Sequence, residues 1–411
     1  MSEEILEEGD DMTTKAGRRA FLQKSGYTLA AVGGGALLAS CGSDGGDEAA
    51  AGGDTGDAGE DGVEAVELDA QDGETVEWDM TTSWPAGLST LQGAEDNNSG
   101  ALGFARNVGT LTGGAFTINT FAAGDRAGAL DVIDVIQAGA LQAGHTASYF
   151  YRGLGEPWAF GTAIPFGLTF RQQGSWLWEN GGLEMLRAYY AENFNLINFP
   201  AGSTGVQMGG FFNREINSVD DLQGLTMRIP GLGGEVMSRM GVTPQLLGAG
   251  DIASGLQSGA IDAAEFVGPF DDNNLGLGEA GEFYYYPGWW EPGASLDVFV
   301  DLDAYNDLSP AFQTALENAA KITYLDTMMF YDRVQPIALQ DLIDQGVDVR
   351  RFPDDLMETA RTISDELLDE FAAADPAFAE ILGPWREYRA AVGQWHGTAE
   401  LAMLEALSGD L

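Results

Sequence analysis

The chain has 411 residues, 64 of them acidic and 19 basic, which gives a formal net charge of −45. This length, with a hydrophobic content of 45%, allows a large buried core. A strongly negative surface repels nucleic acid and anionic lipid headgroups, so we expect no nucleic-acid partner. The single cysteine, Cys41, excludes a disulfide within the chain and a cysteine-rich zinc site.

The acidity also bears on the environment of the protein. Lysine occurs only at positions 15, 24 and 321. A surplus of acidic side chains keeps a protein hydrated in strong salt, where screening weakens its self-repulsion. We therefore hypothesise a salt-loving (halophile) host. The alternative is an acidic protein from an ordinary environment.

Residues 1–41 contain the parts of an export signal in their usual order along the chain. Arg18 and Arg19 precede an apolar stretch over residues 27–39, which is too short to span a bilayer. Paired arginines are typical of twin-arginine export, and residues 38–41 resemble a lipobox that ends at a lipidated Cys41. We predict a twin-arginine lipoprotein signal peptide, and hence an exported protein, periplasmic or at the cell surface, anchored to the membrane by lipid. A chance buried cysteine is the alternative.

Residues 42–73 consist mainly of Gly, Ala, Asp and Glu. Such a segment cannot bury enough apolar surface to fold, so we predict a disordered acidic tether. The folded domain is expected over residues 74–411.

The folded domain alternates strands with helices and then becomes mostly helical. Expected strands lie at 75–82, 116–121, 143–148, 195–199, 207–213, 225–229, 263–267 and 299–302. Expected helices lie at 94–111, 129–138, 218–222, 234–240, 251–259, 310–344, 354–374 and 376–407. This alternation predicts an α/β fold with largely parallel sheet.

Four segments resemble the signatures of one family. They are GHTASY at 144–149, LQGLTMRIPG at 222–231, IDAAEFVGP at 261–269 and YYYPGWWEPG at 284–293. Together they are similar to the DctP-like substrate-binding proteins of tripartite ATP-independent periplasmic (TRAP) transporters. Within that family they resemble the subgroup that binds 2-oxo acids or lactate with a metal ion. The similarity extends from about Trp78 to the C-terminal helices.

The resemblance implies a two-lobed periplasmic binding protein of type II-like fold, with hinge strands and long C-terminal helices that span the lobes. Lobe I is expected over about 74–203 and 268–320. Lobe II is expected over about 204–267, together with the C-terminal helices.

The implied function is solute binding and not enzymatic. The protein would capture a small 2-oxo or 2-hydroxy monocarboxylate, such as pyruvate or lactate, and deliver it to the TRAP membrane permease subunits. One alternative is a ligand-binding input protein for a sensor. Another is a metal-assisted enzyme acting on a small organic acid, but the chain lacks G-x-S-x-G and HExxH motifs. A homodimer through the C-terminal helix is a further hypothesis, because relatives can exchange such a helix.

A buried carboxylate ligand needs a permanently charged partner that can donate two parallel hydrogen bonds, and arginine meets both requirements. Arg228 lies in the middle of an expected strand, between Met227 and Ile229. By resemblance it is the signature arginine that binds the ligand. The alternative is a structural ion pair with a nearby acid.

A bound cation would also offset the negative charge of the chain where an anion must bind. Glu265 lies in an apolar strand, and Glu291 follows two tryptophans. By resemblance, Gln207, Glu265, the backbone carbonyl of Phe266 and Glu291 hold one Na⁺ or Ca²⁺ ion. The alternative for each glutamate is an exposed or salt-bridged acid. The family usually has tryptophan where this chain has Phe266, which alters the pocket wall but leaves a carbonyl ligand.

The expected substrate-binding residues are Arg228, Gln207, Tyr149 and Phe266. The Tyr149 hydroxyl could reach the keto or hydroxyl oxygen of a ligand. Further aromatic candidates for the cleft walls, for which plain core packing is the alternative, are Trp84, Phe150, Phe166, Phe211, Trp289 and Trp290. His145 is interpreted as a structural histidine rather than a ligand or base.

Overall fold

The computed structural model describes residues 73–408. The predictions for the signal peptide, Cys41 and all but the last residue of the tether lie outside these residues. The described part contains two sheets, with strand orders β2-β1-β3-β10-β4 and β11-β9-β5-β8-β6-β7. We call the elements around them the first and the second lobe. The two sheets with flanking helices confirm the predicted α/β class.

The first sheet is part parallel and part antiparallel. β1 (Val76–Thr82) pairs in parallel with β2 (Phe116–Phe121) and β3 (Ala143–Thr146). β10 (Ala294–Asp301) runs antiparallel to β3 and to β4 (Leu196–Gly205). Every residue of β4 is buried, including the polar Asn198, Ser203 and Thr204.

The second sheet is built from short strands. β6 (Thr226–Arg228) is parallel to β7 (Thr243–Gln245) and β8 (Ala263–Ala264). β5 (Gly210–Phe212) is antiparallel to β8 and to β9 (Phe283–Tyr286). β9 in turn pairs in parallel with β11 (Asp348–Arg351). The expected lobe boundaries place residues 283–286 in lobe I, and this is wrong because β9 pairs within the second sheet.

Helices of the N-terminal half surround the first sheet. α2 (Gly100–Leu111) begins six residues later than expected. The preceding segment instead turns back on itself, and Ala101 and Leu102 donate backbone hydrogen bonds to Leu91 and Gln92. Further helical elements here are α3 (Val132–Gln137), η1 (Ser148–Leu154), η2 (Glu156–Trp158), α4 (Ala159–Thr162), α5 (Phe170–Glu179) and α6 (Gly182–Phe194).

The second lobe carries shorter helical elements. They are η3 (Val219–Leu222), α7 (Gly231–Arg239), α8 (Ala249–Ser258), α9 (Pro269–Asn274) and η4 (Leu277–Glu279). η3 begins as predicted after Ser218, which forms a capping box with Asp221. The short helix α10 (Leu302–Asn306) follows β10 in the first lobe.

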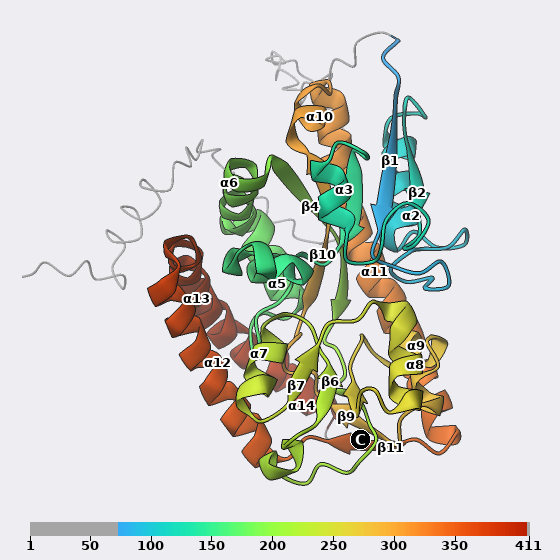
Figure 1. The fold of residues 1–411 in the computed structure, drawn as a ribbon. Helices are drawn as coiled ribbons and strands as arrows, with labels where there is room; N and C mark the ends of the chain where they lie inside the picture. Colours follow the sequence, from blue (N-terminus) through green and yellow to red (C-terminus); the bar gives the residue numbers. More distant parts are fainter. Residues whose placement is uncertain (1–72, 409–411) are drawn as a thin grey trace, which may run out of the picture. The chain divides into compact units, whose positions relative to one another are not determined.

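The long helix α11 (Pro310–Asp344) belongs to both lobes (Figure 1). Phe312 and Leu316 near its start pack into the core of the first sheet. Tyr331 and Leu342 near its end pack with Phe211 and Tyr284 of the second sheet. The helix therefore spans the lobes, as the resemblance implies.

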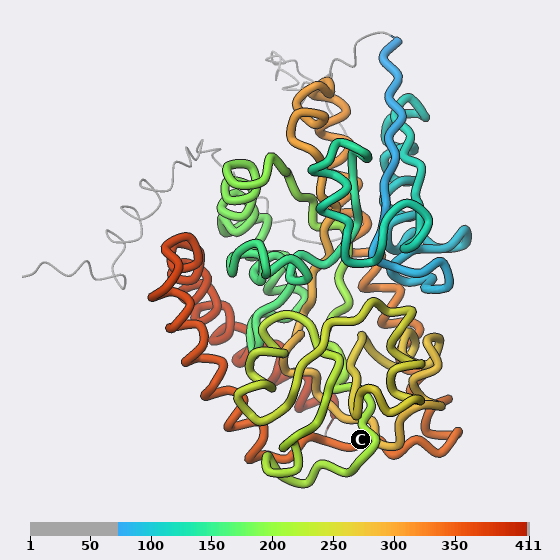
Figure 2. The backbone as a smooth tube through the Cα atoms, in the orientation of Figure 1, coloured from blue at the N-terminus to red at the C-terminus, as the bar shows by residue number. Residues whose placement is uncertain are grey.

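The last helices run side by side (Figure 2). α12 (Asp354–Ala374) packs against α7, and Leu356 and Leu367 enter the core of the second lobe. α13 (Pro376–His396) instead packs on α5 and α6. Assigning all C-terminal helices to lobe II is therefore wrong for α13. The chain continues through η5 (Gly397–Leu401) and α14 (Ala402–Ser408). Within residues 73–408, no helix combines the length and the apolar character needed to cross a membrane.

Candidate functional site

Arg228 and Glu265 lie at the ends of two adjacent parallel strands. Arg228 is the last residue of β6, and its Cα partner on β8 is Ala264. Glu265 follows directly, and its backbone N–H donates to the Arg228 carbonyl at 3.2 Å. Parallel strands thus bring both side chains to one edge of the sheet, the edge where ligands bind in open α/β folds.

The two side chains form a buried ion pair. Arg228 is 2% exposed and Glu265 is fully buried. Nη1 of Arg228 donates to the Glu265 carboxylate and, at 2.8 Å, to the Glu265 backbone carbonyl. Nε donates to the Leu247 carbonyl at 3.2 Å. The ion pair that sequence analysis offers as an alternative to ligand binding is therefore present.

Gln207 and Glu291 reach the same region from the strands that join the lobes. Gln207 follows β4 and Glu291 precedes β10, and these two strands pair through Gly205 and Ala294. The Gln207 N–H donates to the Glu291 carbonyl at 3.1 Å. The Gln207 amide Nε2 donates to Thr204 Oγ1 at 3.1 Å, which turns its Oε1 away from this partner.

Three buried oxygen atoms of these residues have no hydrogen-bond partner: Gln207 Oε1, Glu265 Oε2 and Glu291 Oε2. Burying such atoms without a partner is costly. Carboxylate and amide oxygens are the donors that hard cations such as Na⁺ and Ca²⁺ prefer. The residues present thus fit a hard cation. The described residues hold no group of three or more His, Cys, Asp or Glu side chains that could bind a metal.

Tyr149 and Phe266 border the same groups. Both are nearly buried, and the Arg228 guanidinium carbon lies 5.5 Å from the centre of the Phe266 ring. Burial raises the pKa of Tyr149 well above its ordinary value, and the negative charges of Glu291 and Glu265 raise it further. Tyr149 is therefore a neutral hydrogen-bond donor beside these carboxyl groups.

Burial dominates the electrostatics of the two glutamates. It raises the pKa of Glu265 to about 7, against the opposing influence of Arg228. Burial also raises the pKa of Glu291 well above its usual range, and the nearby Glu265 charge adds to this effect. When both carboxyl groups are ionised, the single arginine leaves them one positive charge short, and a bound cation would supply that charge.

A cavity of about 290 Å³ lies beside this cluster, between the lobes. Tyr149, Phe150 and Arg152 line it from the first lobe, and Ile229, Pro230 and Gly231 from the second. Ile229 to Gly231 follow Arg228 directly in the chain, but Arg228 and Glu265 themselves do not line this cavity. Of the expected substrate-binding residues, Tyr149 lines it.

The other aromatic candidates do not line this cavity. Phe211 stacks on Tyr284 with ring centres 4.2 Å apart, within a core cluster. Trp290 packs in the core of the second lobe. Phe166 and Trp289 stack on each other beside a separate cavity of about 270 Å³.

His145 is fully buried and both of its ring nitrogens are engaged. Trp84 Nε1 donates to Nδ1 at 2.6 Å, so Nε2 carries the proton and donates to the Ala201 carbonyl at 3.2 Å. Burial lowers the pKa of His145 to about 4. This is a structural histidine, as expected, and Trp84 is its partner rather than part of the cavity wall.

Two residues near the site were not predicted from the sequence. Thr204 orients the Gln207 amide, and Arg152 crosses between the lobes to the Gly231 carbonyl. Thr204 lies three residues before Gln207 among small residues at the end of β4, and nothing in this local sequence marks it.

These features define a class of protein: a two-lobed binding protein with a buried, charged site where its lobes meet. Residues 91–375 match the family model described as bacterial extracellular solute-binding protein, family 7 (DctP). The chain belongs to this family of TRAP solute-binding proteins.

The chain is also similar to several proteins whose ligands are known. A monocarboxylate 2-oxoacid-binding periplasmic protein of Nostoc sp. strain PCC 7120 is 47% identical over 327 residues, which cover 80% of this chain and 88% of that protein. A solute-binding protein from Bordetella bronchiseptica RB50, crystallised as a mixed-occupancy dimer with calcium and picolinate, is 37% identical. Its TM-score is 0.78, with 82% of this chain and 98% of that chain covered.

A further structure comes from Colwellia psychrerythraea, with bound calcium and pyruvate. It is 34% identical, with a TM-score of 0.76, and covers 81% of this chain and 99% of its own. The protein from Pseudoalteromonas atlantica T6c was crystallised with bound sodium and pyruvate. It is also 34% identical, with a TM-score of 0.76, and the match covers 80% of this chain and 99% of that chain.

Proposed function

We propose that this chain is the extracytoplasmic solute-binding protein of a TRAP transporter and captures a small 2-oxo or 2-hydroxy monocarboxylate, such as pyruvate or lactate, together with one sodium or calcium ion. The observation that carries the proposal is the buried cluster of Arg228 with the unpaired oxygens of Gln207, Glu265 and Glu291. The ligands of the Nostoc, Colwellia and Pseudoalteromonas relatives support it.

Each residue has a distinct part in this proposal. Gln207, Glu265, the Phe266 carbonyl and Glu291 hold the cation, which supplies positive charge next to the ligand carboxylate. Arg228 donates two parallel hydrogen bonds to that carboxylate. The ligand then competes with Glu265 for the guanidinium, since the two side chains are paired in this structure. Tyr149, kept neutral by burial, donates to the keto or hydroxyl oxygen.

A thermal-shift screen tests the ligand class. Pyruvate, lactate, 2-oxobutyrate and 2-oxoisovalerate, each with sodium or calcium, should raise the melting temperature, because a ligand that binds only the folded state stabilises it. Succinate is the control, since its second carboxylate adds negative charge to an acidic site. A shift with succinate alone would contradict the proposal.

The alternative functions make different predictions. A sensor input protein would bind the same acids but would contact a receptor instead of permease subunits, and co-purification with either partner decides between them. An enzyme would convert the acid. We propose that the chain is not an enzyme: pyruvate incubated with the calcium-loaded protein should be recovered unchanged.

The proposal includes export and a lipid anchor. Residues 1–41 would direct twin-arginine export, and Cys41 would carry the lipid. A Cys41→Ser variant expressed in a bacterial host should move from the membrane fraction to the soluble fraction. Membrane retention of this variant would contradict anchoring at Cys41.

The C-terminal helices support a homodimer. Trp395, Leu401, Met403, Leu404 and Leu407 are each more than half exposed. Leu401 and Leu404 border a cavity of about 530 Å³ whose other wall includes Phe170, Val206 and Met328. Exposed apolar side chains beside such a cavity are typical of a protein interface. The Bordetella relative was also found as a dimer.

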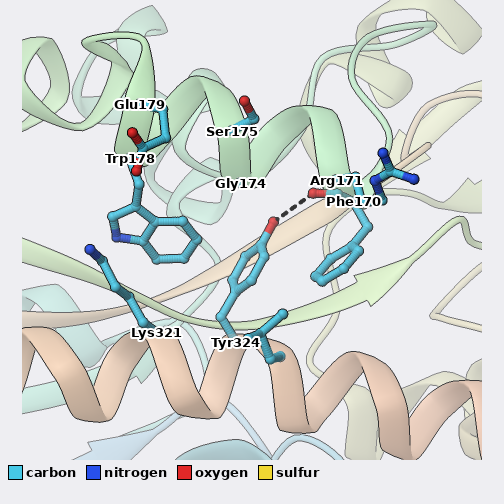
Figure 3. A pocket seen from close by; sticks show the side chains of 9 residues that line it. Phe170, Arg171, Gly174, Ser175, Trp178, Glu179, Lys321 and Tyr324 are labelled. Atoms are coloured by element: carbon cyan, nitrogen blue, oxygen red, sulfur yellow. Dashed lines mark hydrogen bonds between the residues drawn. The ribbon is translucent and has the colours of Figure 1, made fainter. Parts of the chain in front are cut away.

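A neighbouring hollow extends this surface over α5 and α11 (Figure 3). Phe170 stacks on Tyr324 with ring centres 5.0 Å apart, and the Tyr324 hydroxyl donates to the Phe170 carbonyl at 3.1 Å. Lys321 and Glu179 both line this hollow of about 310 Å³, and Arg171 is paired with Glu400 of the same chain at 2.8 Å. We propose that the apolar end of a second copy's C-terminal helix packs here.

Light scattering of a Leu401→Glu/Leu404→Glu variant tests the dimer. The wild type should have twice the mass of the chain and the variant the mass of one chain. Ile343→Glu is the matched control, since Ile343 is also exposed but lies at the far end of α11. A wild type that is monomeric at micromolar concentration would contradict the dimer.

A further inference from the structure

Arg152 connects the two lobes at the cavity. It lies on η1, which follows β3 of the first sheet, whereas Gly231 begins α7 after β6 of the second sheet. Nη1 of Arg152 donates to the Gly231 carbonyl at 2.9 Å. Separating the lobes along this edge must break that hydrogen bond.

Two neighbours hold the Arg152 side chain in this position. Its Nε and Nη2 donate to Glu156 Oε2 at 3.0 and 2.6 Å. Its guanidinium carbon also lies 5.5 Å from the centre of the Phe371 ring on α12. Both groups fix the planar guanidinium group of Arg152 whether or not Nη1 bonds to Gly231. The hydrogen bond to Gly231 therefore forms at little further cost in side-chain entropy.

The acceptor is equally constrained. Gly231 has φ = +64°, and a Cβ at this position would lie 3.3 Å from the Tyr149 ring. Tyr149, Arg152, Ile229, Pro230 and Gly231 all line the cavity of about 290 Å³. The polypeptide from Arg228 to Gly231 thus connects the ligand-binding arginine directly to the interlobe bond.

We propose that Arg152 is a latch that holds the lobes together over a bound acid, positioned by Glu156 and closed on the carbonyl of Gly231. Arg152 is a positioning residue and not a ligand contact, because all three of its guanidinium nitrogens bond to these two residues. Arg228, in contrast, uses only Nε and Nη1 for its bonds to the described residues. It therefore governs how slowly the ligand leaves. This inference rests on the proposed function, since it assumes that the cavity between the lobes leads to the acid.

Stopped-flow tryptophan fluorescence with pyruvate and calcium measures the latch. In Arg152→Ala the dissociation rate constant should rise by about tenfold or more, the effect of losing one charge-assisted hydrogen bond. The association rate constant should stay within about twofold. Arg152→Lys should behave like Arg152→Ala, because one ammonium group cannot keep the forked contacts to Glu156 and Gly231.

The matched control is Arg351→Ala, which removes the same charge from an exposed arginine paired with Asp354 on the second lobe. Should Arg152→Ala be poorly folded, Glu156→Gln gives a second test and should raise the dissociation rate constant by a smaller factor. An unchanged dissociation rate in both Arg152→Ala and Glu156→Gln would overturn the latch. A slower, salt-dependent association would instead mean electrostatic steering and would also overturn it. Failure of the wild type to bind pyruvate would refute the proposed function rather than the latch alone.

Discussion

Arg228 and Glu265 form an ion pair in which both side chains are almost fully buried. The same arginine nitrogen donates to the Glu265 backbone carbonyl at 2.8 Å. From the sequence, an ion pair and a ligand contact are alternatives for Arg228, but the two are compatible. A ligand carboxylate can share or replace Glu265 at the guanidinium, provided that another positive charge offsets Glu265. In this account the cation supplies that charge.

Replacing Arg228 should abolish tight binding of the acid. We expect Arg228→Ala to weaken pyruvate binding by at least about 30-fold, the loss typical of a buried charge pair. Arg228→Lys should also lose at least about tenfold, because lysine cannot donate two parallel hydrogen bonds. Isothermal titration measures both. Arg351→Ala is the control and should bind like the wild type. An affinity of Arg228→Ala close to that of the wild type would refute the assignment.

Removing one carboxylate should weaken cation binding. Glu291→Gln keeps the size of the side chain but removes a charge, and we expect its calcium affinity to fall by at least about tenfold. Fluorescence of the neighbouring Trp289 and Trp290 provides the signal. Glu366→Gln, which alters an exposed acid on α12, should leave calcium affinity unchanged. If Glu291→Gln binds calcium as the wild type does, Glu291 is not a ligand.

The dependence of stability on pH should carry the signature of buried acids. Burial raises the pKa of Asp297 from 3.8 to about 7 and that of Asp271 to about 6. The folded state then binds protons more tightly than the unfolded state. These two groups therefore stabilise the fold fully below about pH 4, and this stability is lost as the pH rises to about 7. His145, with a pKa lowered to about 4, contributes in the opposite direction between about pH 4 and 6.5.

Asp297→Asn isolates one of these groups. Asp297 Oδ1 accepts from Asn198 at 2.9 Å, and an asparagine oxygen can accept the same hydrogen bond. Between pH 4 and 7, folding of the wild type takes up a proton at Asp297, and folding of the variant does not. The slope of the unfolding free energy against pH should therefore be less negative in the variant, by up to about 1.4 kcal/mol per pH unit. Urea denaturation across this range measures the slope. Identical slopes for wild type and variant would contradict a raised pKa at Asp297.

The charge of −45 predicts a response to salt. Screening should relieve repulsion among the acidic side chains, so the melting temperature should rise from dilute buffer to molar KCl. Differential scanning calorimetry measures the shift, with choline chloride used to exclude a specific effect of potassium. If stability is indifferent to salt over this range, the hypothesis of a halophile host is wrong.

The long elements were predictable from sequence, because their boundaries are marked locally. α11 and α12 begin and end where predicted, after Ser309 and Pro353. The helices between residues 148 and 194 were missed. Trp158, Trp176 and Tyr190 there are all buried, so aromatic residues face the core from several directions and no single apolar stripe repeats with helical spacing.

The candidate site could be predicted in part. Arg228, Glu265 and Glu291 are charged residues in apolar or aromatic surroundings, which is a local signal of burial. The strand pairing that brings Gln207 next to Glu291 depends on residues more than 80 positions apart, and no local pattern specifies it. Arg152 gave no signal, since its partners are a nearby glutamate and a backbone carbonyl in the other lobe. The assignment of ligand and metal roles to these residues stays a prediction.

Calorimetric titration of pyruvate into the protein with and without its cation tests the central claim most directly. One sample is loaded with calcium, and the other is treated with chelator in sodium-free buffer. We predict one binding site per chain with calcium and an affinity lower by at least about tenfold without any cation, because binding free energies of linked ligands are reciprocal. Equal pyruvate affinity in both samples would contradict an account in which Arg228 and a cation held by Gln207, Glu265 and Glu291 bind one carboxylate together.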